Sequence, residues 1–228
     1  MLAELGAFLR AVEEHGVEAA QKLIVDENLL GKSSDAARDS AVANLNKLYA
    51  LNRPPPITRA MARLWQSDQV GRPLLAMLCA LARDPLFRDT ADTVTNARFG
   101  DGVRWPALAD AIAAKHPDRF SQAMLKSMAQ NCASSWTQSG HLNGLRNKVR
   151  QRVEATPEVV TFAALIAEAA GFGGPGILSS PWLTVLDAGE EERLGLLRRA
   201  QGRGLVRARH AGAVFELKVS PDLTADFA

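Results

Sequence analysis

The sequence predicts a mainly α protein, built of tandem small helical modules with helix-turn-helix or winged-helix character and a C-terminal β-hairpin. Apolar residues recur at helical spacing through most of the chain up to residue 200. Residues 205–219 alone show the alternation and the central turn of a strand pair. Residues 53–56, Arg-Pro-Pro-Pro, interrupt the helical pattern as a stiff connector that we expect to be non-helical. We therefore expect three modules, at 1–53, 57–155 and 156–228.

The first module has the pattern of a helix-turn-helix. Two short helices precede a turn that contains Gly31, and a third, Ser-capped helix follows, with its N-cap within residues 32–35. This places Lys32, Ser33, Ser34 and Arg38 at an exposed helix start, where recognition helices contact DNA. Many helical hairpins share the pattern and bind nothing, so a purely structural hairpin remains the alternative.

The second module reads as a helical bundle. Residues 57–66 form a helix, and residues 72–83 are apolar nearly all round, which predicts the central helix of the bundle. Asp84 and Pro85 are a typical N-cap and first helical residue, and they predict one helix whose apolar face continues to Val94. Further helices are expected to begin at Trp105 and after Arg119.

Residues 119–153 are the strongest candidate for a functional surface. They contain six Lys or Arg and no Asp or Glu. Residues 134–141 add a run of hydroxyl and amide side chains around Trp136, which suit phosphate oxygens and base edges. Trp136 itself falls on an apolar helical stripe, so we predict a core residue. The alternative is a helix end followed by a polar loop and an exposed basic helix.

The conformation of residues 142–153 is left open by the sequence. Arg146, Lys148, Arg150 and Arg152 alternate with other residues, and a period of two suggests an extended segment. A helix remains the alternative. In either case we expect these four cations to form the main nucleic-acid surface.

The third module is expected to hold helices, including one near residues 190–200, and then the hairpin. A helix followed by a hairpin is the second half of a winged helix. Arg207 and Arg209 share one face of the first strand and could reach phosphates. On an ordinary hairpin they would be a solvated edge that discourages aggregation.

The net charge of +2 conceals a separation of charge. Residues 193–215, like residues 119–153, carry six basic and no acidic side chains, so the remainder of the chain is acidic overall. Such segregation can orient an anionic partner, whereas a merely solvated surface more often mixes the two signs.

Composition also indicates the compartment. Cys79 and Cys132 fall in apolar helical patterns, which fits buried thiols in a reducing compartment better than a disulfide. The start of the chain lacks the basic region of a signal peptide. The longest apolar run, 74–82, is far shorter than the roughly 20 residues that span a bilayer. We expect a cytoplasmic protein that does not contact a membrane.

Catalytic signals are weak. The four histidines are scattered, and no Cys and His pair has metal-ligand spacing. Ser139 and His141 are close in sequence, but no acid within 119–153 could orient the histidine. Residues 171–176 match the spacing of a dinucleotide-binding loop, yet they follow a helix and include Pro175, so we interpret them as a helix end and turn. We expect no enzyme, no cofactor and no metal.

Four segments carry a resemblance to a known family: residues 27–33 (ENLLGKS), 72–85 (RPLLAMLCALARDP), 133–142 (ASSWTQSGHL) and 211–216 (AGAVFE), of which the third is the most specific. They resemble the BrxA family of bacteriophage exclusion (BREX) defence systems. The resemblance implies a small, mostly helical, non-enzymatic protein with winged-helix-like features that binds DNA. It also implies work beside the methyltransferase, ATPase and other components of such a system.

The resulting hypothesis is a non-enzymatic protein that binds double-stranded DNA mainly through phosphates, as a monomer or weak dimer. An assembly module of the defence complex, a transcriptional regulator and an RNA-binding protein are the alternatives. The predicted DNA-binding residues are Lys32, Ser33, Ser34, Arg38, Ser135, Gln138, Ser139, His141, Arg146, Lys148, Arg150, Arg152, Arg207 and Arg209.

Overall fold

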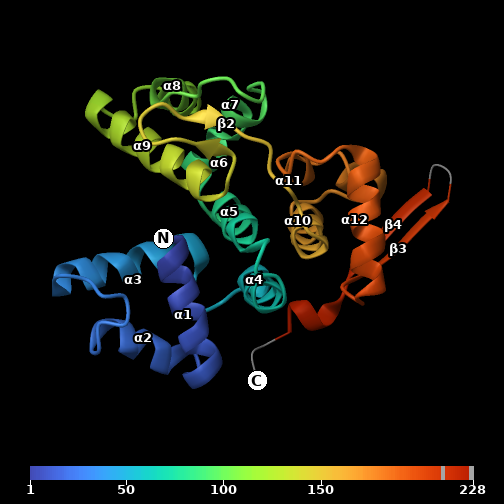
Figure 1. The fold of residues 1–228 in the computed structure, drawn as a ribbon, viewed down its shortest axis with the longest axis horizontal. Coiled ribbons are helices and arrows are strands. Elements are labelled where there is room, and N and C mark those ends of the chain that lie inside the picture. The colour runs from blue at the N-terminus through green and yellow to red at the C-terminus, as the bar shows by residue number, and fades with distance from the viewer. Residues whose placement is uncertain (212–213, 226–228) are drawn as a thin grey trace.

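The computed structural model describes residues 1–211 and 214–225 of the chain. They are mainly helical and include two small antiparallel hairpins (Figure 1). The mainly α fold and the C-terminal hairpin are confirmed. The turn predicted at Ala211 and Gly212 falls partly outside the described residues.

The N-terminal helices are α1 (Leu2–His15), α2 (Val17–Val25) and α3 (Asp35–Tyr49), drawn in blue in Figure 1. The N-cap predicted within residues 32–35 is Ser34, whose hydroxyl accepts a hydrogen bond from the amide of Ala37 at 3.3 Å. Leu5, Ile24 and Leu45, one from each helix, are fully buried. Hydrophobic burial therefore holds the three helices together.

The central helices are α4 (Pro56–Ser67), α5 (Arg72–Arg83), α6 (Pro85–Asp89), α7 (Ala91–Thr95), α8 (Trp105–Lys115) and α9 (Gln122–Gln138). Every residue of α5 from Leu74 to Leu81 is buried, which confirms it as a central helix. Trp136 on α9 is fully buried, and its indole donates to the hydroxyl of Thr90 at 2.9 Å. The prediction that Trp136 is a core residue is confirmed.

The chain after α9 is extended, which decides between the two conformations left open for it. Strands β1 (Leu142–Asn143) and β2 (Val149–Arg150) form the first hairpin. Gly144 makes the turn at φ +111°, and a Cβ there would lie 2.2 Å from the carbonyl oxygen of Asn147. Only glycine fits this position.

The C-terminal part consists of α10 (Pro157–Ala169), a 3₁₀ turn (Gly174–Ile177), α11 (Pro181–Thr184), α12 (Glu190–Gly202), β3 (Val206–Ala211), β4 (Val214–Val219) and a second 3₁₀ turn (Pro221–Leu223). Strands β3 and β4 pair antiparallel, with Val206 opposite Val219. Figure 1 shows this hairpin beside α12, on the side away from α10.

Helix α10 is a second central helix, and it joins the predicted modules. Its residues from Pro157 to Ala164 are all buried, and it packs against α4, α5, α11 and α12. Buried side chains of all three predicted modules belong to one continuous hydrophobic cluster. The modules therefore share a core. The boundary at 155–156 lies between β2 and α10, whereas residue 57 lies inside α4.

Two local predictions were wrong. Pro56 is not part of a non-helical connector but the first residue of α4, a position where its missing N–H costs nothing. The single helix expected after Asp84 is divided at Thr90 into α6 and α7. The fully buried Thr90 hydroxyl donates to the carbonyl of Phe87 at 2.7 Å and accepts from Trp136, and this contact competes with a regular helix.

Two expectations from composition can be compared with the structure. Cys79 and Cys132 are free and buried, as predicted, and burial raises the pKa of each thiol to about 12. Among the described residues, no helix combines the length and the apolar character needed to cross a membrane.

Candidate nucleic-acid interface

Arg150, predicted as a phosphate contact, is a core residue. Its side chain is fully buried, and its Nε donates to the carbonyl of Val94 at 2.8 Å. Its guanidinium also donates to the carboxylate of Asp187 and to the carbonyl of Gln151. All of its hydrogen-bonding capacity faces the protein, so the prediction that it contacts DNA was wrong.

Ser139 and His141 are also buried, with exposures of 4% and 0%. His141 Nε2 lies 2.7 Å from the carbonyl of Val185, and because a carbonyl can only accept, this nitrogen carries the proton. Nδ1 of the neutral ring then accepts from the Ser139 hydroxyl at 2.8 Å. These two residues hold the β1 end against α11 and cannot reach a DNA surface, which corrects their assignment.

Burial lowers the pKa of His141 to about 4. The carbonyl of Val185 and the charge of Asp187 oppose this shift, and the charge of Arg150 adds to it. His141 is therefore neutral near pH 7 and makes no electrostatic contribution to anion binding.

Three further cations of the predicted set have acidic partners. Arg152 is exposed and pairs with Glu192 at 2.7 Å. Lys32 pairs with Glu4 at 2.9 Å. Arg38 donates to Asp35 and, at 2.8 Å, to the carbonyl of Val25. The N-terminal end of α3 therefore presents little uncompensated positive charge. This makes it a weak candidate for a DNA-binding surface.

The pKa of the Glu4 carboxyl reflects its ion pair with Lys32. Burial raises the pKa of Glu4, but hydrogen bonds from Lys32 and from the chain's amino group outweigh this effect. The pKa of Glu4 is consequently held at about 2. A phosphate would have to compete with a carboxylate that is ionised at all physiological pH values.

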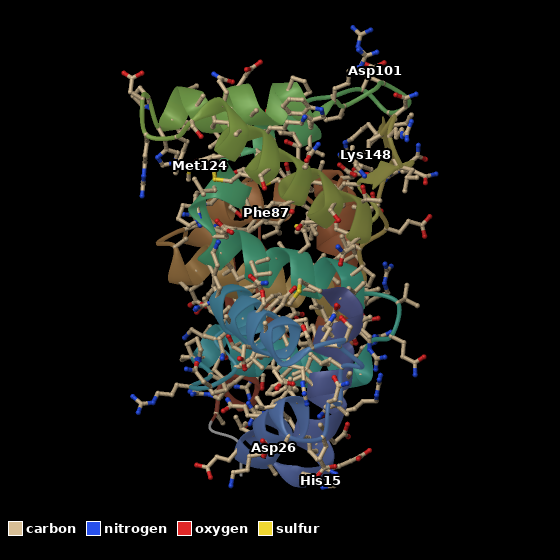
Figure 2. The ribbon with its side chains drawn as sticks, turned by 90° about the vertical axis from the view of Figure 1, so that its left-hand side faces the viewer. His15, Asp26, Phe87, Asp101, Met124 and Lys148 are labelled. Atoms are coloured by element: carbon tan, nitrogen blue, oxygen red, sulfur yellow. The ribbon has the colours of Figure 1, made fainter. Side chains whose placement is uncertain are left out.

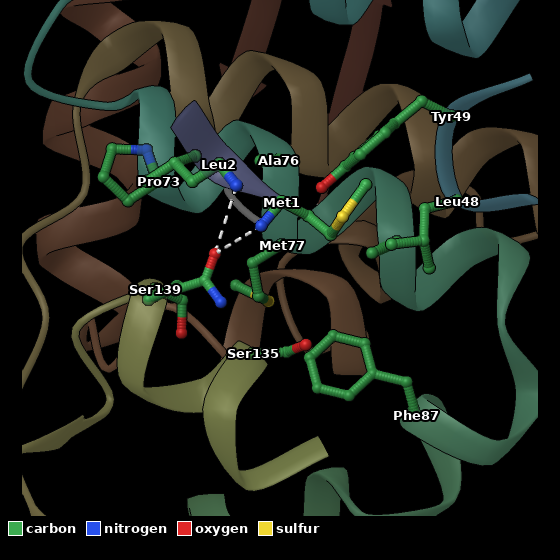
Figure 3. A pocket seen from close by; sticks show the side chains of 12 residues that line it. Met1, Leu2, Leu48, Tyr49, Pro73, Ala76, Met77, Phe87, Ser135 and Ser139 are labelled. Atoms are coloured by element: carbon green, nitrogen blue, oxygen red, sulfur yellow. Dashed lines mark hydrogen bonds between the residues drawn. The ribbon is translucent and has the colours of Figure 1, made fainter. Parts of the chain in front are cut away.

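The remaining polar residues serve the fold or are simply exposed. Gln138 accepts from the backbone amide of Leu2 at 3.1 Å and so fastens α1 to α9, as the dashed lines in Figure 3 show. Ser135 lines the small cavity drawn in Figure 3, of about 30 Å³, and also a neighbouring pocket of about 350 Å³. Ser33 and Ser34 are exposed, and the latter is occupied as the cap of α3.

Arg146 and Lys148 remain available from the predicted main surface. Arg146 is exposed, and Lys148 donates to the Thr137 hydroxyl at 2.7 Å, a neutral partner that leaves its charge uncompensated. Both line a groove next to the end of α9. Figure 2 shows Lys148 below the loop that carries Asp101, at the opposite end of α9 from Met124.

The C-terminal basic residues form a second surface. Arg203 pairs with Glu158, Lys218 with Glu216 at 3.5 Å, and Arg193 donates to the carbonyl of Leu178. Four exposed arginines then have no acidic partner in the part of the chain that the structure describes, and we call them the α12–β3 surface: Arg198, Arg199, Arg207 and Arg209.

The two elements of the α12–β3 surface are joined directly. The side-chain oxygen of Gln201, on α12, accepts from the backbone amide of Ala208, on β3, at 2.9 Å. Arg198 lies one helical turn before Gln201, and Arg207 and Arg209 flank Ala208. This hydrogen bond links the second half of the helix to the strand that carries Arg207 and Arg209.

Sequence reasoning missed several residues of these surfaces. Arg198 and Arg199 were counted in the basic segment 193–215 but not named as DNA contacts, although their exposure makes them equal candidates with Arg207. Lys126 and Gln130 were not predicted as site residues, because only the apolar stripe of α9 was used to interpret this helix. The spacing of Lys126, Gln130 and Ser134, at i, i+4 and i+8, was the available signal.

No protein-family model, curated protein or solved structure matches this chain.

Proposed function

We propose that the chain binds duplex DNA, mainly through phosphate contacts made by the α12–β3 surface. The observation that carries the proposal is the group of four exposed arginines without acidic partners among the described residues. Arginine forks match the geometry of phosphate oxygens, and each neutralised phosphate releases counterions.

The pairing of the hairpin supports an anionic partner. Arg207 lies directly opposite Lys218, and Arg209 lies opposite Glu216. Directly opposed side chains share one face of an antiparallel pair, and like charges in this position are destabilising. Glu216, which pairs with Lys218, offsets part of that repulsion, and a phosphate near Arg207 would offset more of it.

The local order of elements fits this proposal but limits the mode of binding. Helices α10, α11 and α12 followed by a hairpin are in the order of a winged helix. However, Glu190, Glu191 and Glu192 are exposed at the N-terminus of α12, where a recognition helix would enter the major groove. These charges would repel DNA. We therefore propose contacts from the second half of α12 and from β3, with weak sequence selectivity.

A non-catalytic role is part of the proposal. The Ser139 hydroxyl and His141 are within hydrogen-bond distance, as in a nucleophile and base pair. Their burial leaves no space for a substrate at the hydroxyl oxygen. Together with the resemblance to the BrxA family, this supports a DNA-binding component of a bacteriophage exclusion system over an enzyme of that system.

The proposal is tested by measuring affinity for duplex DNA, single-stranded DNA and RNA over a series of salt concentrations. We expect duplex binding with little sequence preference, and a fall in affinity with a log–log slope of about 0.9 for each phosphate contact. Absence of duplex binding at low salt would refute the proposal and leave the assembly-module alternative. Preference for RNA over duplex DNA would favour the RNA-binding alternative.

A further inference from the structure

A groove that none of the proposed duplex contacts uses lies between α8, α9 and the first hairpin. Its volume is about 480 Å³, within the ~300–1,000 Å³ of typical small-ligand pockets. It is lined by Trp105 at the start of α8, by Gln130 and Ser134 of α9, and by the hairpin residues Leu145, Arg146 and Lys148. We call this the Trp105 groove.

The walls of the Trp105 groove are fixed by the backbone. The amide of Val103 donates to the carbonyl of Lys148 at 2.8 Å, so the segment before α8 is tied to β2. The Lys148 ammonium in turn donates to the Thr137 hydroxyl at 2.7 Å, which ties the hairpin to α9. Gly144 fixes the turn, as described above. The groove is therefore formed before any ligand arrives, which lowers the entropy cost of binding.

The chemistry of the groove combines an aromatic face with positive charge. Trp105 is 37% exposed, unlike the fully buried Trp136. Lys126 lies over the Trp105 ring, with its Nζ 5.6 Å from the ring centroid. Arg146 and Lys148 add two further cations, and none of the described residues that line the groove is acidic.

We propose that the Trp105 groove binds one unpaired nucleotide of a nucleic acid. The base stacks on the Trp105 indole, Gln130 and Ser134 offer hydrogen bonds to its edge, and Arg146 and Lys148 hold the adjoining phosphates. The inference rests on the proposed function, because it adds recognition of an unpaired base to a protein that binds duplex DNA elsewhere on its surface.

A nucleotide explains the groove better than an acidic peptide. An acidic peptide would require only the cations of the groove. Its binding would not explain the partly exposed Trp105 indole beside the Gln130 amide and the Ser134 hydroxyl. Base stacking on an aromatic side chain, phosphate contacts from Arg and Lys, and amide contacts to base edges are the three elements of single-strand recognition. All three occur within one groove here.

The test compares a short, fully paired duplex with the same duplex carrying one unpaired thymine. The parent protein should bind the bulged duplex about 5- to 100-fold more tightly, the effect of one stacked base. Trp105→Ala should abolish this preference and leave affinity for the paired duplex unchanged, whereas Trp105→Phe should retain most of it. Phe99→Ala is the matched control, because Phe99 is also an exposed aromatic residue but does not line the groove.

A second measurement does not depend on a variant that might lose stability. An unpaired 5-iodouracil placed in the bulge should photocrosslink to Trp105 in the parent protein, and mass spectrometry identifies the site. Binding of the paired duplex without any bulge preference or crosslink would overturn this inference and leave the proposed function intact. Equal displacement of the bulged duplex by poly-glutamate and by a thymine oligonucleotide would also overturn it, since the groove would then recognise charge alone.

Discussion

Arg150 and Asp187 form an ion pair with side-chain exposures of 0% and 6%. The pair joins β2 to the segment between α11 and α12, and Asp187 also accepts from the amide of Val153 at 3.1 Å. The most basic stretch of the chain is thus anchored to the C-terminal helices by one of its own cations. The positive charge that a sequence count assigns to the surface is partly inside the protein.

This ion pair predicts different stabilities for two neighbouring arginine variants. Arg150→Ala should lower the free energy of unfolding by about 3–5 kcal/mol, because it leaves the Asp187 carboxylate buried without a positively charged partner. Arg152→Ala removes an exposed pair with Glu192 and should cost less than about 1 kcal/mol. Denaturant unfolding of both proteins measures the difference. Equal effects would show that the Arg150 guanidinium is not held in the core.

His141 predicts a pH dependence of stability. The unfolded histidine, with an ordinary pKa of 6.5, takes up a proton in a range where the folded one, with a pKa of about 4, does not. The free energy of unfolding should therefore fall as pH decreases from about 6.5 to about 4, by about 3 kcal/mol in total for this group. Below that window the contribution should be constant.

The control for this prediction is His141→Gln, which cannot titrate but can still donate to the Val185 carbonyl. The stability difference between parent and variant should shrink by about 3 kcal/mol across the same window. Parallel pH profiles for the two proteins would mean that His141 is not buried in its neutral form.

At Gly71, the start of α5 lies close to α10, and this predicts the effect of a larger side chain there. A Cβ at this position would lie 2.0 Å from the Asp68 carboxylate and 2.7 Å from Val159. The Asp68 carboxylate accepts from the Gly71 amide and from the hydroxyl of Thr156, which caps α10. Gly71→Ala should therefore cost about 1–3 kcal/mol, since it displaces this bridge.

Gly195 is the matched control for Gly71, because it lies within α12 and a Cβ there would meet nothing within 4 Å. Gly195→Ala should stabilise the protein by about 0.5–1 kcal/mol, as expected for alanine in a helix. Thermal melts of both variants provide the comparison. Shifts of the same sign would be inconsistent with the described packing at Gly71.

Local signals in the sequence predicted most helices, whereas the candidate site depended on distant residues. Ser34, Asp84 and Thr156 each cap a helix from the adjacent position, so their role is visible in a short segment. The carboxylates that neutralise Lys32 and Arg150 lie 28 and 37 residues away. Counting charge within a stretch cannot detect such partners, and it therefore overstated the free charge of residues 119–153.

The Trp105 groove, too, could not be predicted from local sequence patterns. The alternation of cations in 146–152 correctly suggested an extended segment, but not which cations would be buried. That outcome depends on the pairing of β2 with the loop at Gly102 and on contacts with α9, which no local pattern encodes. Trp105 showed only as a helix start, since its exposure follows from tertiary packing.

Two quadruple variants, compared with the parent protein, test whether the α12–β3 surface binds duplex DNA. The first variant replaces Arg198, Arg199, Arg207 and Arg209 with Ala. The second removes the same charge from exposed positions elsewhere, through Arg10→Ala, Lys22→Ala, Arg53→Ala and Lys115→Ala. Both should keep the stability of the parent, because exposed charges contribute little to folding.

The measurement is duplex affinity as a function of salt concentration for the parent and both variants. The account predicts that the first variant loses affinity on the order of a hundredfold or more near physiological salt, and that its log–log slope falls by about 3 to 4. The second variant should stay within a few-fold of the parent. Equal affinity and equal slope for the first variant and the parent would contradict the claim.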